Sequence, residues 1–197
     1  MADPQAIVAV LAGGGATRMG GAKATAMLGG RPLIEWPLAA AREAGLETIV
    51  LAKADTALPP LEEPVVQEPE LPLHPLTGVL KALELAGARS PAPAVVIVGC
   101  DMPFLTGELL GWLAVLRGAA TAQVDGRLQP LLARCHPLHR GILQAALAEQ
   151  SSLAAAISSL EPRVLDEREL SRFGDPERLC FNVNSPEDLA RAQEWLA

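Results

Sequence analysis

The stretch "AIVAVLAGGGATRMGGAK", residues 6–23, decides the fold class of this chain. It begins with a continuous apolar run over 6–12 that ends at three glycines, and the runs at 47–53 and 94–100 have the same character. Continuous runs rich in β-branched residues are typical of parallel strands that helices cover on both faces. The stretch therefore predicts a buried parallel strand that leads directly into a flexible loop.

Helical patterns lie between these expected strands. One covers residues 32–46, where Pro37 is expected to shorten or kink the helix, and the other covers 76–88 with an apolar stripe. Strands that alternate with helices are typical of layered α/β proteins. We therefore expect a three-layer α/β/α sandwich with a mixed, mostly parallel sheet.

The remaining chain shows no internal repeat and no linker, so 1–197 is expected to form a single domain. Residues 55–75 hold six prolines and are expected to be a loop around one short strand. Asp125-Gly126 between two apolar runs predicts a hairpin over 120–135. The other expected elements are helices near 137–149 and 151–160, strands near 163–165 and at 178–183, and a closing helix capped by Ser185.

Composition restricts the function classes. The net charge of −7 argues against broad nucleic-acid binding, which needs a basic surface, but a locally positive pocket could still bind a small anion. Cys100, Cys135 and Cys180 are far apart and indicate neither a zinc site nor a disulfide framework. We expect a reduced, cytoplasmic setting and see no targeting or membrane segment.

The glycine loop suits an anion, because glycines let backbone N–H groups approach it without a Cβ in the way. The loop does not match the GxxxxGK[ST] pattern, and Arg18 stands where a GxGxxG motif needs its third glycine. Arg18 and Lys23 are cations that could meet a triphosphate. A glycine-rich turn with two solvated cations is the alternative, and composition alone leaves both open.

Asp101 comes just after the apolar run at 94–100. In open α/β sheets the carboxyl ends of the strands are where ligands bind. A carboxylate there suits Mg²⁺, which takes one or two protein oxygens together with phosphates and waters. The alternative is that Asp101 only caps a turn. Thr106 is expected to cap the next helix.

Four segments in order resemble the signature of the nucleotidyltransferase superfamily, and within it the molybdenum cofactor guanylyltransferases of the MobA type. They are "LAGGGATRMGGAK" (11–23), "HPLTGVLKAL" (74–83), "GCDMPFL" (99–105) and "NVNSPEDL" (182–189). The resemblance implies a Rossmann-like, glycosyltransferase-A-like fold. It also implies Mg²⁺-dependent transfer of GMP from GTP to molybdopterin, with release of pyrophosphate.

The resemblance implies site residues in three groups. Arg18, Lys23 and Asp101 would act in catalysis, with Mg²⁺ held by Asp101. The nucleotide would contact Leu11, Ala12, Gly13, Gly14, Gly15, Lys23, Glu68, Pro75, Leu76, Gly78 and Asp101. The acceptor would contact Gln129, Arg134, Asn182 and Asn184.

Departures from the family pattern leave alternatives open. His74 stands for the usual glycine and Thr77 for the usual alanine, and "GGAK" (20–23) lacks the acidic residue that guanylyl relatives often have before the lysine. The alternatives are a cytidylyl- or sugar-phosphate transferase of the same superfamily and a non-catalytic nucleotide-binding protein. The expected partners are GTP and molybdopterin, with neither nucleic acid nor membrane. The oligomeric state stays open between a monomer and a chain that transiently contacts other proteins of cofactor biosynthesis.

Overall fold

Strand β1 (Ile7–Leu11) is an interior strand of a seven-stranded sheet with the order β5-β4-β1-β6-β8-β7-β9. The computed structural model describes residues 6–13 and 23–196. β1 pairs in parallel with β4 (Thr48–Ala52) and with β6 (Val95–Gly99). These are the three apolar runs of the sequence, and nearly every residue in them is buried.

The outer strands make the sheet mixed. They are β5 (Val65–Gln67), β7 (Ala120–Val124), β8 (Arg127–Cys135) and β9 (Arg163–Leu165), with β2 (Met27–Leu28) and β3 (Arg31–Pro32) forming a separate ribbon. Among the described strands of the large sheet, only β8 runs antiparallel to its neighbours. The β7–β8 hairpin turns at Asp125 and Gly126, which have φ values of 51° and 69°, so the predicted hairpin is confirmed.

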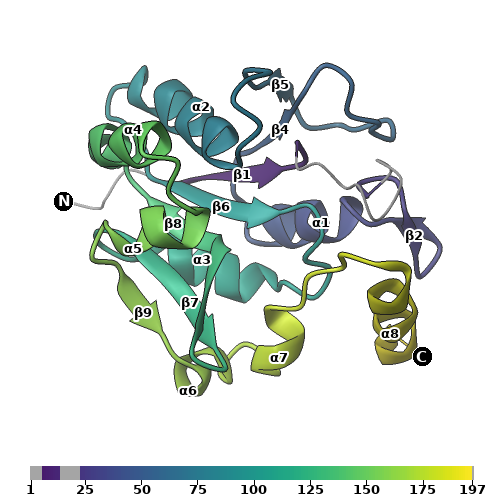
Figure 1. Ribbon diagram of the computed structural model, residues 1–197. Coiled ribbons are helices and arrows are strands. Elements are labelled where there is room, and N and C mark those ends of the chain that lie inside the picture. The colour runs from purple at the N-terminus through teal and green to yellow at the C-terminus, as the bar shows by residue number, and fades with distance from the viewer. Residues whose placement is uncertain (1–5, 14–22, 197) are drawn as a thin grey trace.

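Helices cover both faces of the sheet (Figure 1). On one face α1 (Glu35–Glu43) packs on α3 (Gly107–Val115); on the other, α2 (Leu76–Gly87) packs on α4 (Arg140–Ala148), next to α5 (Leu153–Ser158). Successive residues of β1 alternate between two cores: Val8 and Val10 join the first, and Ile7 and Ala9 the second. The three-layer α/β/α sandwich with a mixed, mostly parallel sheet is confirmed.

Pro37 shortens the first helix rather than kinking it. It is the third residue of α1, where a backbone N–H has no partner within the helix, so proline costs no hydrogen bond there. The predicted N-caps are also present: Thr106 Oγ1 accepts from Leu109 N at 3.3 Å, and Ser185 Oγ accepts from Asp188 N at 3.1 Å.

One predicted element is wrong. Residues 178–183 form no strand; the helix α7 (Pro176–Leu179) ends there and irregular chain follows. The physical reason is local, because Asp175 caps the Arg178 N–H at 3.0 Å and Pro176 occupies the first helical position. The other short elements are η2 (Pro137–His139), α6 (Glu167–Leu170) and the closing helix α8 (Pro186–Leu196).

The three cysteines are buried and unbridged. Burial raises the pKa of each thiol to about 12, so they remain protonated at neutral pH. Across the described residues, no helix has the length and apolar character needed to cross a membrane.

Candidate functional site

The carboxyl ends of three parallel strands bring the predicted site residues to one edge of the sheet. Gly13 follows β1, Glu68 follows β5 and Asp101 follows β6. The register aligns these ends, since Leu11 is opposite both Leu51 and Gly99. Such an edge is where open α/β sheets bind their ligands.

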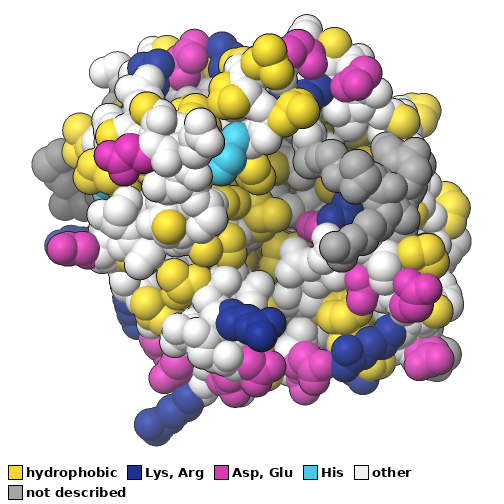
Figure 2. Space-filling model, in the orientation of Figure 1, with side chains coloured by type: hydrophobic (Ala, Val, Ile, Leu, Met, Phe, Trp, Pro, Cys, Tyr) yellow, Lys and Arg dark blue, Asp and Glu magenta, His cyan; other side chains and the backbone are white. Residues whose placement is uncertain are grey.

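A pocket of about 80 Å³ lies at this edge. Its lining includes seven residues predicted to bind the nucleotide: Leu11, Ala12, Gly13, Lys23, Glu68, Pro75 and Asp101. Leu76 and Gly78 lie next to it in the first turn of α2, with Leu76 fully buried. Figure 2 shows a hollow on the molecular surface with hydrophobic side chains along its floor. The predicted residues Gly14, Gly15 and Arg18 lie outside the described residues.

Lys23 and Asp101 form an ion pair in this pocket. Lys23 Nζ donates to Asp101 Oδ2 and, at 2.7 Å, to Asn184 Oδ1. Asp101 is only 5% exposed, and no described residue donates a hydrogen bond to its buried Oδ1. A Cβ at Gly99 would lie 2.3 Å from that oxygen, so the absent side chain leaves room for the carboxylate. Asp101 therefore has one oxygen paired with Lys23 and one buried oxygen that no described residue pairs.

The packing of the C-terminal helix brings Asn184 to Lys23. Leu28 of β2 and Leu33, next to β3, share a small core with Val183 and with Ala192 of α8. In addition, Gly29 N donates to Gln193 Oε1 at 3.0 Å, and Val183 N donates to Asp101 O at 2.9 Å. Asn184, predicted as an acceptor ligand, thus contacts a predicted catalytic residue directly.

The Glu68 carboxylate forms the opposite wall of the pocket. A Cβ at Gly13 would lie 1.9 Å from its Oε1, and a Cβ at Gly78 would lie 2.4 Å from its Oε2, so both glycines are needed for the carboxylate to fit. Burial raises the pKa of Glu68, while the nearby Lys53 ammonium opposes that shift. Lys53 was not among the predicted site residues; its position directly after β4, at the same sheet edge, was the available signal.

His74 and Thr77, which depart from the family pattern, stabilise the start of α2. His74 Nδ1 accepts from Leu76 N at 3.1 Å, and Thr77 Oγ1 donates to His74 O at 2.7 Å. His74 therefore satisfies one of the free N–H groups at the helix start. With His74 and Thr77 at these positions, the chain still leads from Pro75 directly into α2.

The residues predicted to contact the acceptor do not all lie in one region. Gln129 and Asn182 line a second pocket of about 470 Å³, together with Arg127 and Glu177 among others. Arg134 is not brought to this region: it pairs with Val96 near the opposite end of β6, is buried, and donates to Gly118 O. The geometry gives Arg134 a role in tying β8 to the Gly118 turn.

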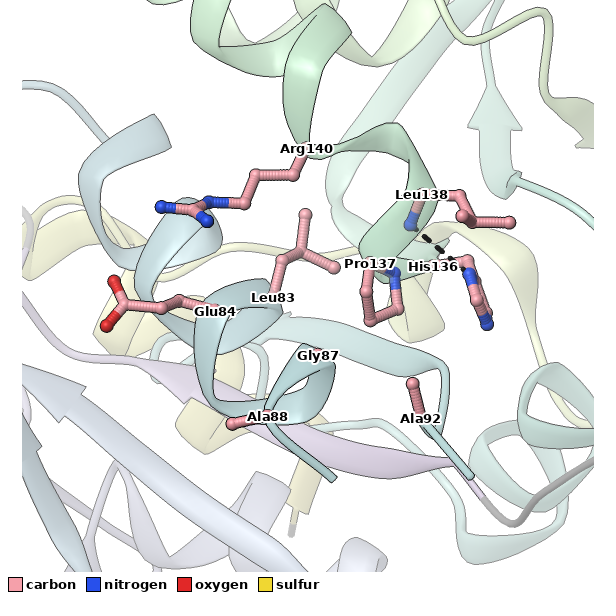
Figure 3. Close-up of a pocket in the computed structure, with 9 residues that line it drawn as sticks. All are labelled: Leu83, Glu84, Gly87, Ala88, Ala92, His136, Pro137, Leu138 and Arg140. Atoms are coloured by element: carbon pink, nitrogen blue, oxygen red, sulfur yellow. Dashed lines mark hydrogen bonds between the residues drawn. The ribbon is translucent and has the colours of Figure 1, made fainter. Parts of the chain in front are cut away.

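A third pocket, of about 510 Å³, lies at the other end of the sheet, between α2 and η2 (Figure 3). It contains His136, whose Nδ1 accepts from Leu138 N at 3.3 Å. His139 Nδ1 accepts from His136 N at 3.1 Å. His136 and His139, in the stretch "CHPLH" (135–139), therefore cap the 3₁₀ turn η2.

Comparisons with known proteins agree with this geometry. The sequence model of the MobA-like NTP transferase domain matches residues 8–164. A molybdenum cofactor guanylyltransferase of Cereibacter sphaeroides is 38% identical over 195 residues, covering 95% of each chain.

Two solved structures are similar over almost their whole length. The crystal structure of molybdopterin-guanine dinucleotide biosynthesis protein A from Archaeoglobus fulgidus has a TM-score of 0.77 at 25% identity, covering 96% of this chain and 97% of that one. The 2-C-methyl-D-erythritol 4-phosphate cytidylyltransferase of Thermus thermophilus has a TM-score of 0.69 at 23% identity, covering 98% of each, and shares the fold alone. The domain match over residues 8–164 and the relatives that match over nearly the full chain agree with the site at the carboxyl edge of the sheet. This chain therefore belongs to the MobA-like NTP transferase family.

Proposed function

We propose that this protein transfers GMP from GTP to the terminal phosphate of molybdopterin and releases pyrophosphate. The observation that carries the proposal is the Lys23–Asp101 pair beside a pocket walled by Gly13 and Glu68. The guanylyltransferase relatives, which match over nearly the whole chain, support the choice of GTP and molybdopterin as substrates.

Asp101 fits a divalent cation. Its Oδ1 is buried and receives no hydrogen bond from the described residues, which is costly for a carboxylate unless a ligand binds there. The described residues offer no group of three acidic, histidine or cysteine ligands, so Asp101 would bind the ion together with substrate phosphates and water. Mg²⁺ prefers such a set, and when bound it would offset negative charge on the phosphates.

The reaction asks the protein mainly to position two anions and to neutralise charge. An oxygen of the acceptor phosphate forms a bond to the α-phosphorus of GTP, and the bond from that phosphorus to the bridging oxygen of pyrophosphate breaks. The acceptor oxygen is already anionic, so no catalytic base is needed. Lys23, oriented by Asn184, would supply positive charge beside the departing pyrophosphate.

The nucleoside would lie against Glu68 and the loop at Pro75–Gly78. An ionised carboxylate only accepts hydrogen bonds, which suits the N1–H and 2-amino groups of guanine or the ribose hydroxyls. The pocket that Gln129 and Asn182 line would receive the acceptor. Asn184, which accepts a hydrogen bond from Lys23, would connect the acceptor pocket to the nucleotide pocket. We place this reaction in the cytoplasm, which suits three unbridged thiols.

A nucleotide panel tests the proposal. GTP, CTP, ATP and UTP are each incubated with molybdopterin and Mg²⁺, and pyrophosphate release is measured. We expect GTP to be used at least tenfold better than CTP, which requires about 1.4 kcal/mol of discrimination. Equal turnover of CTP would refute the guanylyl assignment and leave the family assignment standing.

A further inference from the structure

Lys53 and Glu68 lie side by side because their strands pair. Strands β4 and β5 lie next to each other (Figure 1). Lys53 follows β4 and Glu68 follows β5, and the parallel register aligns Ala52 with Gln67. The backbone N–H of Glu68 donates to Ala52 O at 2.9 Å, which extends the ladder by one residue. Both side chains therefore leave the sheet at the edge that carries the nucleotide pocket.

The Lys53 ammonium is enclosed by three acceptors. Nζ donates to Pro69 O at 2.7 Å and to Glu70 O at 3.1 Å, and it lies 3.5 Å from Glu68 Oε1. An ammonium has three N–H donors, so two of them are used in these hydrogen bonds while the charge lies beside the Glu68 carboxylate. The Lys53 side chain is only 9% exposed, so solvent screens the pair with Glu68 weakly.

The turn that follows β5 is fastened to the same strand end. Glu70 Oε1 accepts from Ala54 N at 3.1 Å, and Lys53 N donates to Thr56 Oγ1 at 3.1 Å. Glu68 lines the nucleotide pocket, whereas Lys53 does not. We therefore expect the Lys53 charge to act on a bound nucleotide mainly through Glu68 or through the turn.

We propose that Lys53 is a positioning residue of the nucleotide site, which holds the Glu68 carboxylate against Gly13 and Gly78 so that it faces the nucleoside. This inference rests on the proposed function, because it takes GTP as the occupant of the pocket. It adds a residue that acts on nucleotide binding without touching the nucleotide.

The charge balance explains why the pair matters. Glu68 sits in a buried position, and burial disfavours an ionised carboxylate. Without the Lys53 cation, Glu68 would take up a proton or turn away from the pocket. Either change removes a hydrogen-bond acceptor that faces the nucleoside. The part of the site that would bind the phosphates, at Lys23 and Asp101, stays intact. The effect should therefore fall on nucleotide binding and spare the chemical step.

A double-mutant cycle with Lys53→Met and Glu68→Gln tests this inference. The steady-state KM for GTP and kcat are measured for the wild type, both single variants and the double variant. We expect Lys53→Met to raise KM about tenfold in the wild-type background and less than about twofold in the Glu68→Gln background, with kcat within about threefold throughout. Lys81→Met is the matched control, because Lys81 pairs with Glu84 on the exposed face of α2.

The cycle separates positioning from simple stabilisation. Loss of the bonds to Pro69 O and Glu70 O lowers the melting temperature in both backgrounds and so cancels from the coupling. The inference would be overturned if Lys53→Met changed the KM for GTP equally in the two backgrounds. It would also be overturned if Lys53→Met lowered only kcat or only the melting temperature. If the wild type uses CTP instead of GTP, the proposed function fails, while the same cycle run with CTP still decides the role of Lys53.

Discussion

Replacing Asp101 by Asn separates a metal-binding carboxylate from a turn cap. The change keeps the shape of the side chain and removes its charge. In the structure Oδ2 accepts from Lys23, and the buried Oδ1 receives no hydrogen bond from any described residue. An amide could still accept from Lys23 through its oxygen, but it is a poor ligand for Mg²⁺ in the place of a carboxylate.

The stability cost of this substitution should be small. Breaking a fully buried ion pair costs about 3–5 kcal/mol, but the Lys23 side chain is 19% exposed and keeps its bond to Asn184. The variant also removes the charge on an oxygen that no described residue stabilises. We therefore expect a loss of about 1 kcal/mol, which lowers the melting temperature by about 2–4 °C in a domain of this size.

The catalytic cost should be much larger. Loss of one preorganised group that stabilises developing charge costs about a hundredfold in rate, or about 2.7 kcal/mol, and a metal ligand should cost at least as much. The assay is pyrophosphate release from GTP and molybdopterin over a Mg²⁺ titration, with melting followed in parallel. Asp55→Asn is the control, because Asp55 is exposed. Near-normal turnover of the Asp101 variant at low Mg²⁺ would show that Asp101 is only a turn cap.

Two further predictions concern the same pocket. Lys23→Ala should lower kcat more than it weakens GTP binding measured by calorimetry, because its contact strengthens as pyrophosphate leaves; a raised dissociation constant with unchanged kcat would make Lys23 a binding residue only. Gly13→Ala should raise the KM for GTP about tenfold or more, since its Cβ would lie 1.9 Å from Glu68 Oε1, whereas Gly141→Ala meets no atom within 4 Å and should leave KM unchanged. Kinetics that do not distinguish these two glycine variants would contradict the proposed place of Glu68.

Local sequence patterns sufficed for most of the architecture. The apolar runs, the Asp-Gly turn and the capping residues act within a few positions of one another, so the strands at 6–12, 47–53 and 94–100 and the hairpin over 120–135 could be predicted with small errors at their ends. The exception, at 178–183, had apolar strand-like residues, but the Asp175-Pro176 cap started a short helix there.

Sequence also indicated which side chains carry chemistry, since Lys23 follows a glycine loop and Asp101 follows a buried strand. Their roles in catalysis stay predictions. That Lys23 contacts both Asp101, 78 positions away, and Asn184, 161 positions away, was decided by tertiary structure.

The physical reason is that these contacts depend on the parallel register of the central strands and on the packing of α8 against β2, neither of which a local pattern encodes. The same nonlocal packing placed Arg134 at the far end of the sheet and Lys53 beside Glu68. The sequence by itself thus determined the layers and the candidate charges, while the distances between those charges came only from how the layers pack.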